Sequence, residues 1–181
     1  MRVSPTTTAK NRLPATAGPP QACACGRLRR ATRALTQLYD DLMAPAGLRV
    51  TQFSLLRTLA RGGPMRITEL ATAQLLDRTA LSRNLDPLVE RGHVDIVQGE
   101  DARARDVAIT RAGMAALKAA EVHWMRAQQE VARRVGTERL DTLIELLGEL
   151  ESLHPDNASA RPYRPLAPAA KVHKGRARKA T

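Results

Sequence analysis

The sequence predicts a mainly α-helical domain that carries one small β-hairpin. Hydrophobic residues make up 43% of the 181-residue chain but aromatic residues only 2%, so the core must be aliphatic, which suits packed helices. Apolar residues recur at intervals of three and four through most of segment 23–154. Only two short runs, 93–98 and 105–110, alternate apolar and polar residues as strands do.

Both ends of the chain differ in composition from this central segment. Residues 1–22 are rich in Pro, Thr and Ala, and residues 155–181 add a closing basic cluster, so we expect a disordered arm and a disordered basic tail around a domain at 23–154. Of the net charge of +11, the arm carries +3 and the tail +6. The net charge therefore says little about the domain, and nucleic-acid binding by the domain must be judged from the positions of single arginines.

The sequence has no mark of a secreted or membrane protein. No apolar run is long enough to cross a bilayer, and the beginning of the chain has no continuous apolar segment. Two cysteines are too few for a disulfide scaffold. We therefore expect a cytoplasmic protein without a membrane partner.

Caps and breakers divide the first half of the domain into helices. The apolar period predicts a first helix over 23–43. Thr51 is predicted to cap a second helix that ends at the Gly-Gly-Pro run 62–64. Residues 65–67 suffice only for a bridging strand, and Thr68 is predicted to cap a short helix over the next eight residues.

The helix predicted over 78–90 has the clearest pattern. Asp77 is its expected N-cap and Gly92 its C′ residue. Pro87 lies inside it and removes one backbone donor, so we expect a bend in the second half. Its inward stripe consists of Leu81, Leu85, Leu88 and Val89.

Two strands and two longer helices complete the domain. The alternating runs 93–98 and 105–110 predict a hairpin. Its common apolar side is formed by Val94, Ile96, Val107 and Ile109. Thr110 is predicted to cap a helix that reaches about residue 135, and a last helix covers about 137–153. The stripe of this last helix resembles a coiled-coil seam and is wider than one neighbour needs: Leu140, Leu143, Ile144, Leu147, Leu150 and Leu153.

This order of elements predicts a winged helix-turn-helix, in which the second helix of the pair enters the DNA major groove. On helix 78–90 the face opposite the leucines is polar. Arginine donates a bidentate pair to guanine or binds phosphate, and an arginine on the hairpin suits a narrow minor groove. The candidate DNA-binding residues are Thr68, Arg78, Thr79, Ser82, Arg83, Asn84, Arg103 and Arg105.

Two other interpretations compete with DNA binding. Any amphipathic helix exposes arginines, so the polar face could be a solvated surface in a helical interaction module; the arginine-bearing hairpin favours DNA. An enzyme is least favoured, because no catalytic group has a partner, and we expect no cofactor. The four histidines are scattered without metal-ligand spacing, so we expect no metal site.

Segment 67–113 resembles the core of the MarR family of bacterial transcription regulators. The helix matches in DRTALSRNLDPLVERG, the wing in the Asp-Ala-Arg-Ala-Arg run 101–105, and the start of the long helix in the Ile-Thr-x-x-Gly run 109–113. The resemblance implies a homodimer, formed by the first and last helices, on a pseudo-palindromic operator in double-stranded DNA. It also implies repression that a small-molecule effector relieves.

The resemblance further assigns roles within the wing. Asp101 would brace the wing by ion pairing, and Arg103 would enter the minor groove. Ala102 departs from the family pattern, because many members have a second arginine there, and Arg105 is the residue placed to compensate.

The two cysteines, Cys23 and Cys25, allow several interpretations. Three roles compete. The cysteines are either small residues packed at a dimer interface, or the thiols of a redox sensor, or two ligands of a metal ion. Helical residues at i and i+2 lie about 200° apart, so an internal disulfide requires the first helix to begin after Cys25. A disulfide between two copies escapes this limit.

Overall fold

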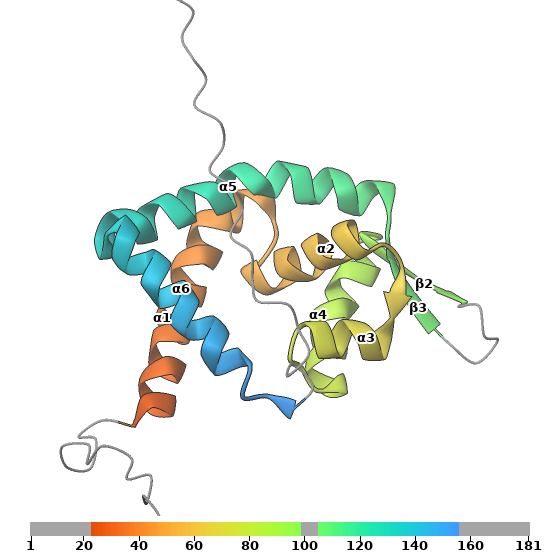
Figure 1. Cartoon of the computed structure of the whole chain (residues 1–181). Coiled ribbons are helices and arrows are strands. Elements are labelled where there is room, and N and C mark those ends of the chain that lie inside the picture. Colours follow the sequence, from red (N-terminus) through yellow and green to blue (C-terminus); the bar gives the residue numbers. More distant parts are fainter. Residues whose placement is uncertain (1–22, 99–104, 156–181) are drawn as a thin grey trace, which may run out of the picture.

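The computed structural model describes residues 23–98 and 105–155 and confirms a mainly helical fold with one small sheet (Figure 1). The elements appear in the order that the sequence predicts. They are α1 (Ala24–Met43), a short 3-10 turn (Ala44–Ala46), α2 (Val50–Gly62), β1 (Met65–Arg66), α3 (Ile67–Ala73), α4 (Arg78–Glu90), β2 (Val94–Gln98), β3 (Arg105–Ile109), α5 (Arg111–Val135) and α6 (Thr137–Glu151).

Helix α5 connects the two parts of the molecule. It runs across the top of Figure 1, with the small sheet and α2 to α4 below its first half and with α1 and α6 at its other end. Both α1 and α2 pack against α5, and α6 folds back on it. The helix-turn-helix and the terminal helices therefore share one long support.

The strands form an antiparallel sheet in the order β1-β3-β2. Val94 pairs with Ile109 and Ile96 with Val107, so the four predicted residues do share one face. Val94 and Val107 are fully buried, whereas Ile96 is 42% exposed. Ile96 therefore lies on the predicted face but remains exposed, since it lies farther along the hairpin from the helices that cover Val94.

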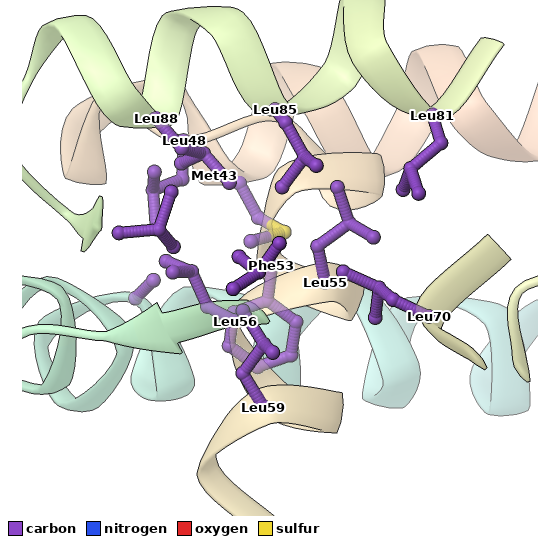
Figure 2. Close-up of a cluster of buried hydrophobic side chains, with 13 residues drawn as sticks. Met43, Leu48, Phe53, Leu55, Leu56, Leu59, Leu70, Leu81, Leu85 and Leu88 are labelled. Atoms are coloured by element: carbon purple, nitrogen blue, oxygen red, sulfur yellow. The ribbon is translucent and has the colours of Figure 1, made fainter. Parts of the chain in front are cut away.

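The core lies between α4, α2 and the start of the sheet. In Figure 2, Leu81, Leu85 and Leu88 extend from α4 toward Phe53 and Leu55 of α2. The three α4 leucines are 0 to 3% exposed, whereas Val89, the fourth residue predicted to point inward, is 37% exposed. Burial of one such side chain contributes roughly 1.5–3 kcal/mol, so this stripe fixes which side of α4 faces outward.

Two of the four predicted N-caps are wrong. Asp77 and Thr110 do cap α4 and α5. Thr51 and Thr68 lie inside helices that begin one residue before them, with Arg49 and Arg66 at the N-cap positions. Their backbone N–H groups donate to side chains at N3, namely Gln52 Oε1 at 3.0 Å and Glu69 Oε2 at 3.1 Å. This N3 half of a capping box needs no hydroxyl at the N-cap.

Other predicted boundaries hold with small changes. Helix α3 ends at Ala73 rather than 76, because Leu75 adopts a left-handed conformation with φ of 50°. Helix α4 continues through Pro87, and Gly92 follows it with φ of 64°. Helix α6 ends two residues early, at Glu151. Across the described ranges, none of the helices is long and apolar enough to span a membrane.

Candidate nucleic-acid interface

The start of α4 is held by its cap. Asp77 Oδ1 accepts a hydrogen bond from the Ala80 N–H at 2.8 Å, and the Leu81 N–H donates to the Asp77 carbonyl at 3.0 Å. Together with the buried leucines, these bonds fix both the first turn of α4 and its rotation about its own axis. The polar side chains of the first two turns therefore have defined directions.

Four of the predicted contact residues are gathered on this exposed face: Arg78, Thr79, Ser82 and Arg83. Neither guanidinium forms an ion pair with any residue that the structure describes. The Ser82 hydroxyl lies 3.4 Å from Asp86 Oδ1, which is a long hydrogen bond. The face thus offers two arginines and two hydroxyls, the groups that contact guanine edges and phosphates.

Asn84 and Thr68 lie at the margins of this face. Asn84 is half-buried, and its Nδ2 donates to the Ala80 carbonyl at 2.9 Å, so its amide is directed along its own helix. Thr68 is exposed in the first turn of α3. Of these two residues, Asn84 is therefore the less available for contact with DNA.

The wing is described only at its base. Arg105 is exposed and begins β3, where it pairs with Gln98. Asp101 and Arg103 lie outside the described residues, as do the predicted arm and basic tail.

A glutamine that the sequence does not single out ties the turn of the helix-turn-helix to α2. Gln74, directly after α3, accepts from the Ser54 hydroxyl at 3.0 Å and donates to Thr58 Oγ1 at 2.8 Å. All three side chains are partly buried. One amide thus bridges two residues of α2 and fixes where α4 begins, although no local sequence signal marks it.

A polar groove borders one side of α4. It has a volume of about 720 Å³ and lies between the end of α1, the start of α2 and α4. Asp40 Oδ1 accepts a hydrogen bond from the Val50 N–H at 2.8 Å, so this carboxylate joins α1 to the start of α2. Three arginines line the groove, namely Arg83 of α4, Arg91 directly after α4, and Arg49 before α2.

A second, more apolar cavity of about 450 Å³ lies between α2 and α5. Phe53 and Arg57 line it from α2, and Leu117 and Lys118 from α5. Next to it, the Phe53 and Trp124 rings stack with centroids 5.7 Å apart, and the Arg57 guanidinium lies 4.3 Å from the Trp124 ring centroid. Trp124 is half-buried, and its cation–π contact with Arg57 joins α5 to α2.

The two cysteines lie at the first turn of α1. Both are free and exposed, with Cys23 as the N-cap in an extended conformation and Cys25 inside the helix. Within residues 23–98 and 105–155, no three His, Cys, Asp or Glu side chains come together as a metal site would require.

Helix α6 exposes much of its apolar surface. Leu143, Leu146 and Leu150 are 37 to 51% exposed, and α6 has no buried residue. Leu143 and Leu150 belong to the wide stripe that the sequence predicts, whereas Leu146 lies beside that stripe.

The chain is similar to a protein family and to several solved structures of transcriptional regulators. A family model described as the MarR family matches residues 46–104. The regulator MosR of M. tuberculosis, solved in complex with DNA, is 38% identical with a TM-score of 0.64; the match covers 73% of this chain and 98% of that chain. A MarR mutant from E. coli, complexed with operator DNA, is 25% identical, covers 69% and 91%, and has a TM-score of 0.63. No curated protein sequence matches the chain.

The family model spans the helix-turn-helix and reaches the wing. The likeness to MosR extends over nearly the whole of that regulator. The chain belongs to the MarR family of transcriptional regulators.

Proposed function

We propose that this protein is a sequence-specific DNA-binding regulator that reads its operator with α4. The observation that carries the proposal is the exposed face of Arg78, Thr79, Ser82 and Arg83, fixed on one side by the Asp77 cap and on the other by buried leucines. The DNA-bound state of MosR and of the E. coli MarR mutant supports it.

The chemistry of the α4 face suits the major groove. A guanidinium donates two parallel hydrogen bonds to guanine O6 and N7, and a good bidentate pair contributes roughly 1–3 kcal/mol of discrimination. Hydroxyls at Thr79 and Ser82 contact phosphates or base edges. Arg105, with Arg103 and the bracing Asp101, would extend the contact to the minor groove beside the wing.

The functional unit of this proposal is a homodimer. The exposed leucines of α6 supply an apolar surface that a second copy would cover. A twofold axis would place two α4 helices about one helical turn of DNA apart, so the operator is a pseudo-palindrome.

The proposed mode of action is repression that a small molecule relieves. Both cavities border elements that connect the DNA-reading face to the terminal helices, the first between α1 and α4 and the second between α2 and α5. A ligand there would act by favouring one spacing of the two α4 helices, with a coupling of about 1–3 kcal/mol.

The DNA proposal is tested by fluorescence anisotropy on the region upstream of the protein's own coding sequence. Arg83→Ala should weaken binding about 5- to 150-fold, as expected for loss of roughly 1–3 kcal/mol. Arg61→Ala, at an exposed arginine at the end of α2, is the matched control and should bind as the wild type does. Equal binding by wild type and Arg83→Ala would remove Arg83 from the interface. A wild-type protein that retains no duplex from a genomic fragment selection would favour a helical interaction module instead.

A thiol-based sensor is the second candidate, favoured by the exposure of both cysteines at a helix start. A hydroperoxide would oxidise one thiol to a sulfenic acid, releasing an alcohol, and the second thiol would displace water to form a disulfide. Cys23 already lies outside the helix, so only the turn around Cys25 must unwind, and terminal turns open at low cost. Unchanged DNA affinity after peroxide, in wild type and in Cys23→Ser/Cys25→Ser alike, would rule the sensor out.

A further inference from the structure

Helix α1 carries a basic face in its first half. Arg29, Arg30 and Arg33 are all exposed. At about 100° per residue they fall within a sector of about 100°. The helix has no acidic residue before Asp40, so nothing on α1 neutralises this face locally.

Helix α6 carries the opposite charge along one side. Glu138, Asp141, Glu145 and Glu149 are all exposed. Their spacing places them within about 80° of one another, in a row about 16 Å long. Arg139 is the one basic residue of the helix.

These two faces do not neutralise each other within one chain. Among the described residues, the ion pairs join Glu130 to Arg133 and Arg134 on α5. None of the seven side chains on the two faces forms an ion pair or a side-chain hydrogen bond with a described residue. Each face therefore presents unpaired charge of a single sign.

The acidic face of α6 runs beside exposed apolar side chains of the same helix, whereas the exposed leucine of α1 lies on the side of that helix away from its arginines. On α1, Leu35 is 38% exposed, and on α6, Leu143, Leu146 and Leu150 are 37 to 51% exposed. An apolar strip with a charged margin is the composition of a helix that packs against another helix and pairs charges at its edges.

We propose that the basic face of α1 (Arg29, Arg30 and Arg33) pairs with the acidic face of α6 (Glu138, Asp141, Glu145 and Glu149) of a second copy of this chain. The inference rests on the proposed homodimer and adds how a copy recognises its own kind. Twofold symmetry would make the contact twice. On α6 the charges would flank the leucines, and on both helices they would reject chains with a different charge pattern.

A second copy of the chain would neutralise both charged faces, whereas a nucleic acid would neutralise only the basic face of α1. A phosphate backbone would neutralise the three arginines but would leave the acidic row of α6 without a cation, and that row would repel DNA. A second copy satisfies seven charged side chains with one contact.

The test reverses the charges on each face separately. The first variant is Arg29→Glu/Arg30→Glu/Arg33→Glu, and the second is Asp141→Lys/Glu145→Lys/Glu149→Lys. In sedimentation equilibrium at about 50 mM salt, each alone should dimerise about 10- to 100-fold more weakly than wild type, because attractions become repulsions. At about 1 M salt, where the Debye length is about 3 Å, the loss should shrink to a few-fold.

Mixing the two reversed variants provides the decisive result. The heterodimer again has opposite charges across both of its contacts, and native mass spectrometry should find it in excess of either homodimer. The matched control for the α1 variant, Arg61→Glu/Arg111→Glu/Lys118→Glu, lowers the net charge by the same amount at exposed sites outside both faces and should dimerise as wild type does. Circular dichroism verifies folding, and Arg29→Gln/Arg30→Gln/Arg33→Gln, expected to weaken the dimer less, replaces the reversed set if that set does not fold.

Three results would overturn the inference. One is wild-type dimerisation by both reversed variants at low salt, and another is the absence of a heterodimer excess. The third is a reversed α1 variant that dimerises normally but loses DNA affinity, which would assign the arginines to DNA. A wild-type protein that stays monomeric would instead remove the dimer from the proposed function.

Discussion

At the scale of single residues, the junction between the wing and α5 is the tightest point of the fold. The Thr110 hydroxyl donates to the Gly92 carbonyl at 2.7 Å and accepts from the Gly113 N–H at 2.9 Å. A Cβ at Gly113 would lie 2.0 Å from the His93 carbonyl oxygen. These contacts explain why the Ile-Thr-x-x-Gly run has these residues. The threonine hydroxyl joins the backbone before β2 to the start of α5, and the glycine has no side chain to separate them.

Gly113→Ala should therefore destabilise the protein by about 1–3 kcal/mol, because the backbone of His93 must move to admit the new methyl group. The control is Gly148→Ala in α6, where a Cβ meets nothing within 4 Å. There the same substitution should stabilise by roughly 0.5–1 kcal/mol, as alanine does in a helix. Urea unfolding measures both changes. Equal effects at the two sites would contradict the steric account.

At the scale of elements, α5 holds a charge cluster near its C-terminal end. Glu130 accepts hydrogen bonds from Arg133 at 2.8 and 2.9 Å and from Arg134 at 2.6 Å. These bonds, with the attraction of the two positive charges, lower the pKa of Glu130 from 4.5 to about 2. Because the folded pKa is lowered, this contribution to stability is present above pH 4.5 and is lost as the pH falls toward 2.

The carboxyl of Glu130, followed by NMR, should therefore titrate with a midpoint near pH 2. In Arg133→Gln/Arg134→Gln the midpoint should rise toward 4.5, because both donors and both charges are removed. Arg126→Gln, one turn earlier on α5, should leave the midpoint where it is in the wild type. A wild-type midpoint near 4.5 would mean that the arginines do not bind Glu130 in solution.

The sequence predicts most elements because their signals are local. Asp77 and Thr110 accept the hydrogen bonds expected of N-caps, and the leucines at 81, 85 and 88 point inward as their spacing predicts. The predicted N-caps Thr51 and Thr68 are wrong because a side chain at N3 can accept a hydrogen bond from the N-cap N–H without a hydroxyl at the N-cap.

Contacts between distant residues are what the sequence does not reveal. Gln74 bridges Ser54 and Thr58 across 20 and 16 residues, and Asp40 holds the start of α2. Nothing in the residue types at these positions sets them apart from any surface glutamine or aspartate. The exposed α4 face is predictable in outline, but its fixed orientation depends on these long-range bonds.

At the scale of the whole molecule, the apolar surface of α6 is the largest departure from a self-contained monomer. Leu146, 51% exposed, is at its centre. Leu146→Glu should convert a dimer to a monomer while the helical circular dichroism spectrum stays the same, because the side chain contributes little to the core of one chain. Light scattering measures the change, and Val97→Glu, at a 40% exposed residue on the wing, is the control. A dimeric Leu146→Glu protein would place the interface elsewhere.

The length of α5 gives the junction at Gly113 a mechanical consequence. At 1.5 Å per residue, its 25 residues form a rod about 37 Å long, anchored to the wing base by the Thr110 hydroxyl at one end and joined to α6 at the other. A tilt of about 5° at the far end of such a rod displaces the near end by about 3 Å, comparable with one base-pair step of about 3.4 Å. In the proposed dimer, a small change in the packing of the two copies would therefore shift the wing by about one base pair along the DNA.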